Sequence, residues 1–386
     1  MREVEGAFER KKFNSAKWDE EVQKEGLTPL TVADMEFKVP MEVRNALNNV
    51  VDMGAYGYTY RSEGYYESIT EWLKRRHGIE VNKNLISPGF GVMFSINAAI
   101  RAFSEEGDNI LINTPSYYPF FSAITDNERR MVESPLVFNK DTNQYEIDFK
   151  DLEEKLKESR IYLLSSPHNP TGRVWSNAEM EKIVDLCEKY NVLIISDEIH
   201  SDLILSDCKY ITFFEKCKGR KVELVVCSSA SKTFNLAGLN TSYSYVSAIN
   251  LKEKMEKEIY KTGLYHNNIY GLVATESAYS QCEYWLENLI KYLKINKTNI
   301  LNRLGKYRDK ITIIDSEGTY LMLVKFNKYS SKELMDILRE EVKILVEDGS
   351  SFKCEEGFVR INIACSEDLL KNILDKIENL IKKKER

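Results

Sequence analysis

The sequence predicts an α/β protein with a mostly parallel sheet between helices, followed by a smaller α+β domain. One observation is a set of short, continuous apolar runs, which are typical of parallel strands buried by helices on both faces. These runs lie at residues 109–113, 161–166, 192–197, 224–229 and 242–247. A second observation is the capping box of Ser176 and Glu179 between two runs, which opens a helical apolar stripe. Strand, helix and strand in this order predict a βαβ unit.

The third observation is a change of pattern after about Tyr279. A long charged amphipathic stretch is followed by an apolar run, a helix pattern and another apolar run, at 284–308, 319–326, 331–340 and 358–364. This mixture predicts a smaller α+β domain. The loop-rich first 45 residues are expected to pack with it or over the cleft. We therefore expect a large domain at 46–280 and a small domain made of 1–45 and 281–386.

Composition excludes several classes of protein. The 386 residues carry 54 basic and 60 acidic side chains without a basic stripe, so no nucleic-acid partner is expected. The short basic run at 381–386 is interpreted as a solvated helix end. No run approaches the ~20 apolar residues that span a bilayer, and residues 1–6 lack the apolar stretch of a signal peptide. Seven scattered cysteines without a C-x-x-C pair argue against disulfides or zinc, so we expect a cytoplasmic protein without a metal.

Polar side chains follow three of the apolar runs. Asn169 follows the run at 161–166, Asp197 ends the next with His200 behind it, and Lys232 follows the run at 224–229. Because ligands bind at the carboxyl ends of strands in open α/β sheets, we expect these side chains to converge in one crevice. A metal cluster at this place is the weaker alternative, since the spacing lacks the i, i+4 histidine pair of a zinc helix.

The chemistry of these groups fits one cofactor. Desolvation lowers the pKa of a buried lysine and makes Lys232 a nucleophile for a carbonyl. Asp197 follows four apolar residues, and a buried carboxylate needs a cationic partner such as the protonated pyridine nitrogen of pyridoxal 5′-phosphate (PLP). Asn169 and His200 offer hydrogen bonds suited to the phenolic oxygen of that ring. Two hydroxyls that can donate to its phosphate stand just ahead of the lysine, Ser229 and Ser231.

Three ordered segments carry a family resemblance. Pro-His-Asn-Pro-Thr-Gly at 167–172, Ser-Asp-Glu-Ile-His-Ser-Asp at 196–202 and Ser-Ala-Ser-Lys-Thr-Phe-Asn-Leu-Ala-Gly at 229–238 resemble the class I/II aminotransferase superfamily, PLP fold type I. More narrowly, the chain resembles the cystathionine β-lyase-like C–S lyase branch. The segments that carry this closer likeness are 33–37, 57–58, 114–117, 197–200 and 357–362. The resemblance covers residues 32 to 364.

The resemblance implies a role for each matching residue. Lys232 would hold PLP as a Schiff base and later remove the α-proton of the substrate. Asp197 would pair with the pyridine nitrogen, and Asn169 would contact both the phenolic oxygen and the substrate. Tyr117 would stack on the ring, and Arg360 would clamp the substrate carboxylate in bidentate fashion.

Further residues are assigned by the same resemblance. His200 would lie near the phenolic oxygen, where many relatives have a tyrosine. The phosphate would be bound by the residues at the start of an apolar helical stretch and by nearby hydroxyls: Gly89, Phe90, Gly91, Ser229 and Ser231. Tyr58 would reach the phosphate of a neighbouring subunit, which implies a homodimer. From the residues alone, Tyr117 and Tyr58 fit ordinary packing as well as a site, and Arg360 fits a surface ion pair, although its position within an apolar strand pattern favours a site arginine.

One departure concerns the position eight residues after Lys232. Many aminotransferases carry an arginine or lysine there, whereas this chain has Asn240. The lyase-like branch commonly lacks this cation too. We therefore expect β-elimination on cystathionine or a related cysteine S-conjugate, giving a thiol, pyruvate and ammonia. Two alternatives stay open: an aminotransferase that uses a 2-oxo acid, and a PLP-binding regulatory protein.

Overall fold

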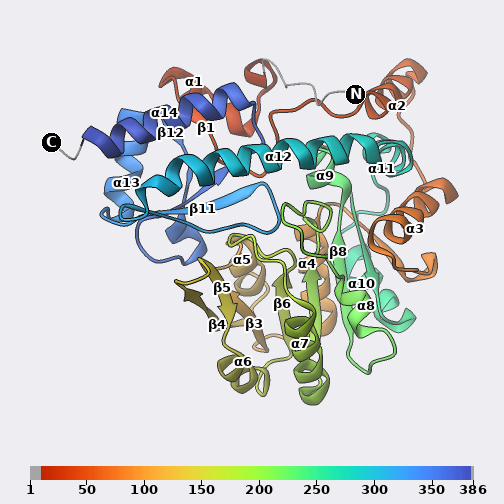
Figure 1. Ribbon diagram of the computed structural model, residues 1–386. Helices are drawn as coiled ribbons and strands as arrows, with labels where there is room; N and C mark the ends of the chain where they lie inside the picture. Colours follow the sequence, from red (N-terminus) through yellow and green to blue (C-terminus); the bar gives the residue numbers. More distant parts are fainter. Residues whose placement is uncertain (1–9, 384–386) are drawn as a thin grey trace.

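The computed structural model describes residues 10–383, so the N-terminal segment 1–6 and the last three residues of the basic run lie outside the described residues. Its largest feature is an eight-stranded sheet (Figure 1). In spatial order the strands are β2 (Ile86–Gly89), β9 (Ser242–Val246), β8 (Leu224–Ser228), β7 (Leu193–Asp197), β6 (Ile161–Ser165), β3 (Asn109–Thr114), β4 (Arg130–Asn139) and β5 (Gln144–Ile147). The five apolar runs of the sequence are therefore all strands, and the α/β class is confirmed.

The sheet is mostly parallel, as predicted, but the run at 242–247, which was expected to be a parallel strand, forms the antiparallel strand β9. Strands β4, β3, β6, β7 and β8 run parallel to one another, but β9 is antiparallel to both β8 and β2. Parallel neighbours need a crossover along the sheet. Between β8 and β9 the chain makes only two short helices, α9 (Ala230–Thr233) and the 3-10 turn Ala237–Leu239, before it turns back. That short return carries Lys232.

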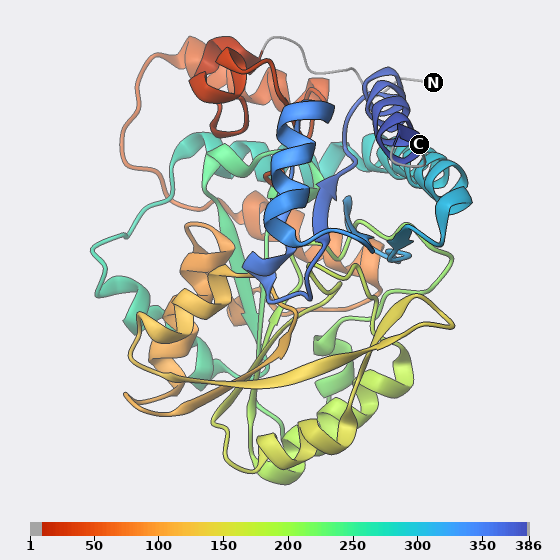
Figure 2. The same ribbon diagram turned by 90° about the vertical axis from the view of Figure 1, so that its left-hand side faces the viewer.

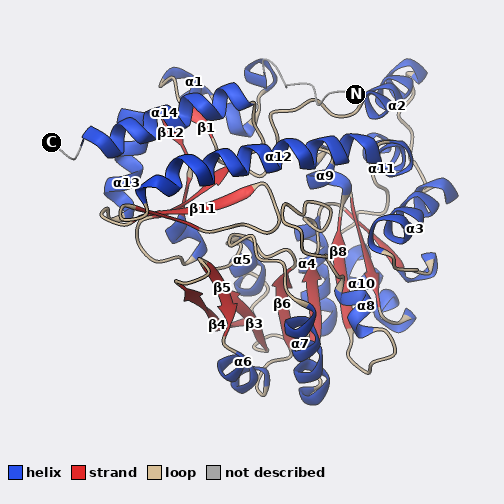
Figure 3. Cartoon of the chain, in the orientation of Figure 1, coloured by secondary structure: helices blue, strands red, loops and turns tan. Residues whose placement is uncertain are grey.

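Helices cover both faces of the sheet (Figure 3). On one face α4 (Val92–Phe103), α5 (Pro119–Thr125) and α10 (Ile249–Tyr260) pack against alternate strand residues such as Ile110 and Ile112. The other face, which includes Leu111, belongs to the larger core. The helices on that side are α6 (Phe149–Leu156), α7 (Asn177–Tyr190), α8 (Phe213–Cys217), α3 (Glu63–His77) and α11 (Ile269–Gln281).

The predicted capping box begins α7. The Ser176 hydroxyl accepts from the Glu179 amide at 3.2 Å, and the Glu179 carboxylate accepts from the Ser176 amide at 2.8 Å. Both bonds satisfy amides that the first turn of a helix leaves without intrahelical partners. This helix connects β6 to β7, so the expected βαβ unit is present.

A second, antiparallel sheet has the order β10 (Ile311–Ile313), β11 (Leu321–Phe326), β14 (Phe358–Asn362), β13 (Glu347–Asp348). Three helices accompany it: α12 (Glu283–Leu304), α13 (Ser331–Ile337) and α14 (Glu367–Lys383). The long α12 runs across the molecule from α11 to this sheet (Figure 1), and the side view shows the small sheet next to the large one (Figure 2). None of the helices in residues 10–383 is long and apolar enough to cross a membrane.

The N-terminal residues pack with the small sheet region. Strand β1 (Thr28–Pro29) pairs in parallel with β12 (Ile344–Leu345), after the short helix α1 (Glu20–Lys24). Helix α2 (Met41–Met53) then leads back to the large sheet region, where it packs on α11. This arrangement agrees with grouping the first residues with the last ones. The domain boundaries themselves stay a prediction.

Candidate active site

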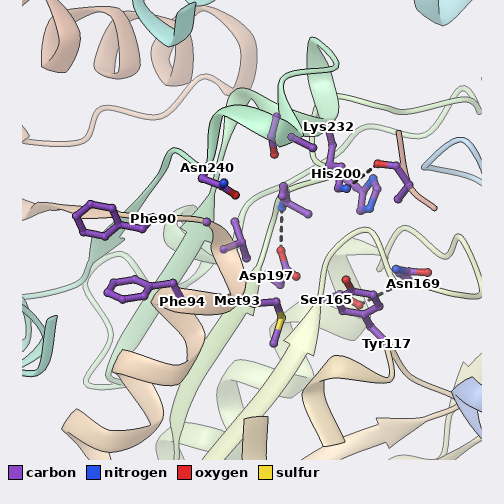
Figure 4. Close-up of a pocket in the computed structure, with 16 residues that line it drawn as sticks. Phe90, Met93, Phe94, Tyr117, Ser165, Asn169, Asp197, His200, Lys232 and Asn240 are labelled. Atoms are coloured by element: carbon purple, nitrogen blue, oxygen red, sulfur yellow. Dashed lines mark hydrogen bonds between the residues drawn. The ribbon is translucent and has the colours of Figure 1, made fainter. Parts of the chain in front are cut away.

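A cavity of about 290 Å³ lies at the carboxyl ends of β6, β7 and β8 (Figure 4). It collects segments that the sequence separates widely, as expected for a crevice at this edge of the sheet. Eight of the residues predicted for the site line it: Phe90, Gly91, Tyr117, Asn169, Asp197, His200, Ser231 and Lys232.

Lys232 lies on α9 in the short return from β8 to β9. Its ammonium nitrogen donates to the Ala33 carbonyl at 2.6 Å. Burial lowers the pKa of Lys232 to about 8, an effect that Arg360 increases and that Asp34 and Asp197 oppose. A substantial share of this side chain is therefore a neutral amine, and thus nucleophilic, at slightly alkaline pH.

Asp197 is the last residue of β7 and is buried at the cavity wall. One carboxylate oxygen accepts from the Ile199 amide at 3.1 Å. Burial raises the pKa of Asp197 to about 7, although the Ile199 amide and Lys232 both favour the charged form. A buried carboxylate in this state is stabilised by a cation placed in the cavity.

His200 contributes a neutral ring to the same wall. Burial, together with Lys232 and Arg360, lowers the pKa of His200 to about 3. Its Nδ1 atom is buried and finds no hydrogen-bond partner within residues 10–383. Buried polar atoms are almost always paired, so an unpaired ring nitrogen at a cavity points to a polar group of a ligand.

The glycine-rich entry to α4 forms one end of the cavity. A Cβ on Gly89 would lie 2.2 Å from Ser242 Oγ and 2.3 Å from Ser95 Oγ, so a larger residue would displace both hydroxyls. Gly91 has φ +117°, which also favours glycine, and its amide donates to Ser242 Oγ at 3.1 Å. The helix that follows has 12 residues and presents the amides of its first turn.

The predicted phosphate loop stays a prediction. Gly89 belongs to β2 and is absent from the cavity lining, and the Gly91 amide is bonded to Ser242 Oγ. Phe90 and Gly91 line the cavity, and so do Val92 and Met93 of the first helical turn. Val92 and Met93 are the first two residues of α4, so their backbone amides are among the donors that the helix leaves without intrahelical acceptors.

The two predicted serines differ in position. Ser231 lines the cavity. Ser229 caps α9: its hydroxyl accepts from the Ser231 amide at 3.1 Å and donates to the Thr241 carbonyl at 2.6 Å. It is buried and absent from the lining, so its proton is committed to the protein. Ser231 is the member of this pair that faces the cavity, and the predicted phosphate contact of Ser229 stays a prediction.

Arg360 of the small sheet does not line the cavity but contacts Asn169, which does. It lies on β14 and is buried, and its Nη1 atom donates to Asn169 Oδ1 at 3.0 Å. The guanidinium also lies over the Phe352 ring, 4.4 Å from its centroid. Since the Asn169 oxygen is engaged by Arg360, its amide NH₂ is the part left to donate into the cavity.

Two tyrosines were predicted for the site, and the structure places them differently. Tyr117 lines the cavity near Asn169 (Figure 4), and burial raises its pKa to about 12, so its hydroxyl is neutral. Tyr58 is 92% exposed and its ring lies 5.3 Å from that of His266, outside this cavity. The predicted role of Tyr58 involves a neighbouring subunit, so it stays a prediction.

Sequence reasoning assigned no role to several residues of the wall. Phe94 follows Phe90 by one helical turn, and their rings meet edge to face at 5.1 Å. The i, i+4 spacing of two aromatics at a helix start was the available signal. The Ala33 carbonyl had no such signal, since a backbone acceptor is visible only in the fold. Other lining residues without an assigned role are Ser165, Ile199 and Ala237.

The fold and this constellation define the class of protein, and comparison with known families agrees. Residues 25–377 match the family model described as aminotransferase class I and II, and the chain belongs to this family.

Individual relatives narrow the likeness. The chain is 34% identical over 378 residues to cystathionine beta-lyase PatB of Bacillus subtilis, covering 96% of this chain and 97% of the relative. It is 29% identical to protein MalY of Escherichia coli, covering 92% of each. Among solved structures, it resembles cystalysin of Treponema denticola, whose structure contains pyridoxal 5′-phosphate, with a TM-score of 0.93, 31% identity and 99% of each chain covered. The PLP-bound C–S lyase of Staphylococcus hominis matches with a TM-score of 0.88, 29% identity, and 96% and 95% of the two chains covered.

Proposed function

We propose that this protein is a PLP-dependent carbon–sulfur β-lyase. Its substrate is an L-amino acid with sulfur on the β-carbon, such as cystathionine or a related cysteine S-conjugate, and its products are a thiol, pyruvate and ammonia. The observation that carries the proposal is the placement of the buried Lys232 amine and the buried Asp197 carboxylate in one cavity. The names of the relatives PatB and the Staphylococcus hominis C–S lyase support C–S cleavage.

The residues of the cavity fit PLP. Lys232 would hold it, and Asp197 would supply the negative charge opposite its ring nitrogen. The unpaired His200 nitrogen and the Asn169 amide suit its phenolic oxygen, and the first turn of α4 suits its phosphate. When bound, PLP supplies an electron sink for the pair of electrons left when the α-proton is removed.

Different side chains of the protein are proposed to bind the substrate, remove the α-proton and stabilise the cofactor's charge. Arg360 binds the substrate carboxylate and, through its bond to Asn169, fixes the α-carbon on one side of the cavity. Lys232, whose lowered pKa provides the neutral amine, takes the α-proton onto Nζ. Asp197 stays ionised opposite the cationic ring, because the cation offsets the burial that raises its pKa. Phe90 and Met93 line the same cavity and limit the room for water.

Amino transfer is the second candidate, because the whole family model is that of aminotransferases. Both reactions need the same proton removal by Lys232. Asn240 lines the cavity. Many aminotransferases are expected to carry an arginine or lysine at this position, so the uncharged Asn240 favours the lyase.

A homodimer is part of the proposal. Exposed aromatic side chains gather beside Tyr58: Tyr60 is 82% exposed, and both rings contact His266 at 5.3 Å. Exposed apolar clusters of this kind mark interaction surfaces. A cytoplasmic location stays a prediction.

The decisive experiment supplies the purified, PLP-loaded protein with L-cystathionine and measures pyruvate and free thiol. A parallel reaction supplies an amino acid with 2-oxoglutarate and measures the new amino acid. Thiol and pyruvate in equal amounts with little transfer are expected. Transfer without thiol would contradict the lyase, and neither product would favour a PLP-binding regulatory protein.

Lys232→Ala tests the attachment of the cofactor. We expect this variant to lose the visible absorbance of the loaded protein and its lyase activity together, because no other amine lines the cavity among the described residues. Lys261→Ala is the matched control, since Lys261 is an exposed lysine at the C-terminus of α10. A Lys232→Ala protein that keeps the absorbance band would overturn the assignment.

A further inference from the structure

The backbone carbonyl of Ala33 receives two hydrogen bonds. The Lys232 ammonium donates to it at 2.6 Å, a bond drawn in Figure 4, and the Tyr320 hydroxyl donates at 2.9 Å. A carbonyl oxygen has two lone pairs, so both donors are satisfied together. Tyr320 immediately precedes β11 of the small sheet, whereas Lys232 lies on α9, which connects β8 and β9 of the large sheet. One oxygen atom therefore joins the two regions at the reacting nitrogen.

The orientation of this carbonyl is fixed by its neighbours. Residues 32–37, which we name the strap, run past the cavity. The Asn362 amide donates to the carbonyl before Ala33, that of Val32, at 2.8 Å and to the one after it, that of Asp34, at 2.6 Å. Because the flanking peptide units are held, the Ala33 carbonyl keeps its direction towards the cavity.

The strap is also tied to the segment that carries Lys232. Asn235, three residues further along, accepts from the Met35 amide at 2.9 Å and donates to the Phe37 carbonyl at 2.8 Å. On the other side the Glu36 amide donates to the Ala364 carbonyl at 2.8 Å. Movement of the strap would therefore require bonds to both sheets to break.

Tyr320 is a permanent donor in this arrangement. Burial raises the pKa of its hydroxyl well above the ordinary value, so it keeps its proton. Its ring meets the His200 ring edge to face at 5.9 Å. Its place is set by the Thr319 amide, which donates to the Leu203 carbonyl at 2.8 Å, and by its own carbonyl, which accepts from the Ile363 amide at 2.9 Å.

The proposed mechanism requires a hydrogen-bond acceptor for Lys232, and the Ala33 carbonyl is in position to be it. Lys232 becomes an ammonium when it takes the α-proton, and a buried ammonium is unfavourable unless an acceptor faces it. We propose that the Ala33 carbonyl is the acceptor that receives Lys232 whenever it is a free ammonium, and that Tyr320 is the positioning residue that aims this carbonyl. The inference rests on the proposed function, in which Lys232 is the base.

Tyr320→Phe tests the inference, because it removes one hydroxyl and keeps the ring. The first readout is the rate at which cofactor-free protein takes up PLP, followed by visible absorbance from pH 6 to pH 10. This rate depends on the amine form of Lys232. With a less well aimed acceptor the ammonium is less stable, so we expect the midpoint of the profile to fall by at least half a pH unit. In the loaded enzyme, kcat should fall about tenfold with KM within twofold, a loss of about 1.4 kcal/mol.

Tyr279→Phe is the matched control. Tyr279 is buried like Tyr320, but its hydroxyl is bonded to Tyr243 at 3.1 Å and not to the strap. It should lower thermal stability to a similar degree and leave the pH midpoint unchanged. Asn362→Ser, which releases the flanking carbonyls, should shift the midpoint in the same direction as Tyr320→Phe.

The outcomes separate this inference from the proposed function. If wild type and Tyr320→Phe share one midpoint, or if the variant's midpoint rises, Tyr320 does not position the acceptor, even when the protein cleaves cystathionine. If the wild-type protein releases no thiol but the midpoint still falls in Tyr320→Phe, the hydrogen-bond assignment stands and the lyase proposal fails.

Discussion

The large sheet and the small sheet contribute in different ways to the same site: the large sheet carries residues that line the cavity, and the small sheet carries residues that bond to this lining. Asp197 and Lys232 come from the carboxyl end of the large sheet, where fully buried parallel strands end side by side. Arg360 lies on β14 of the small sheet and Tyr320 immediately precedes β11; they bond to Asn169 and to the Ala33 carbonyl, which line the cavity. In the proposed mechanism, the large sheet supplies the charges that act on the cofactor and the proton. The groups proposed to bind the substrate and to orient a carbonyl come from the small sheet region. Substitutions in the two regions should therefore have different kinetic signatures.

Asp197→Asn should give the largest effect on activity, and it tests the proposed role of the large sheet. Without the carboxylate, the cationic ring of the cofactor has no negative partner, so we expect kcat to fall by roughly 10²–10³-fold, as for the loss of other preorganised electrostatic groups. KM should change little, because Arg360 is untouched. Steady-state kinetics with L-cystathionine check both values. A fall in affinity for substrate alone would contradict this division between the sheets.

The same substitution should stabilise the cofactor-free protein. Burial raises the pKa of Asp197 from 3.8 to about 7, so the unfolded chain releases this proton first. The folded state consequently loses stability as pH rises between these values, and the loss is complete above about pH 7. The amide introduced by Asp197→Asn carries no such charge. We expect the variant to gain up to roughly 4 kcal/mol in unfolding free energy at pH 8 and almost nothing at pH 4. Denaturant unfolding at the two pH values measures the difference.

Arg360→Lys should weaken substrate binding, the effect expected for substitutions in the small sheet. Lysine keeps the charge but cannot form the two parallel bonds that a guanidinium makes to a carboxylate. Hydrogen bonds to charged groups contribute about 1.5–3 kcal/mol, so kcat/KM should fall roughly 10- to 150-fold, mainly through KM. The visible absorbance of the loaded protein should be unchanged. Equal losses in kcat and in cofactor binding would place Arg360 with the cofactor groups instead.

Thr233→Val is expected to have the smallest effect on activity, and it tests how α9 is held in place. The Thr233 hydroxyl donates to the buried Asp202 carboxylate at 2.7 Å, which also accepts from Trp72 at 3.2 Å and contacts His77 Nε2 at 2.9 Å. Valine removes that donor without changing the shape of the side chain. We expect a loss of about 1.5 kcal/mol in unfolding free energy and a smaller change in kcat than for Asp197→Asn. Thr233→Ser, which keeps the hydroxyl, is the control, and equal stability of the two variants would contradict the role of this bond.

The sequence predicted the large-sheet half of the site better than the small-sheet half. Asp197 and Lys232 stand at the ends of apolar runs, and parallel strand ends meet in space by topology alone. The strands β2, β4 and β5 were missed, because short or half-exposed strands carry little periodic signal. The reversed direction of β9 was missed because β9 is fully buried, like its parallel neighbours, so its apolar run does not reveal its direction.

Local patterns also leave hydrogen-bond partners undetermined. Ser229 and Gly91 are of the right residue type for a phosphate site, yet Thr241 and Ser242 take their bonds. Such competition depends on strand register across the chain. The Ala33–Tyr320 contact, between residues 287 positions apart in the sequence, depends on it as well.

The bond between Arg360 and Asn169 has a consequence for the order of assembly. A ribosome makes the chain from its N-terminal side, so Asn169, Asp197 and Lys232 all exist before β14 has been synthesised. A nascent chain that has folded its large sheet already holds the acidic and the amine groups of the cavity. It lacks Arg360, the residue proposed to bind the α-carboxylate of the substrate. Acquisition of the cofactor can thus precede recognition of the substrate during biosynthesis, and the reactive lysine can be occupied before amino acids have a place to bind.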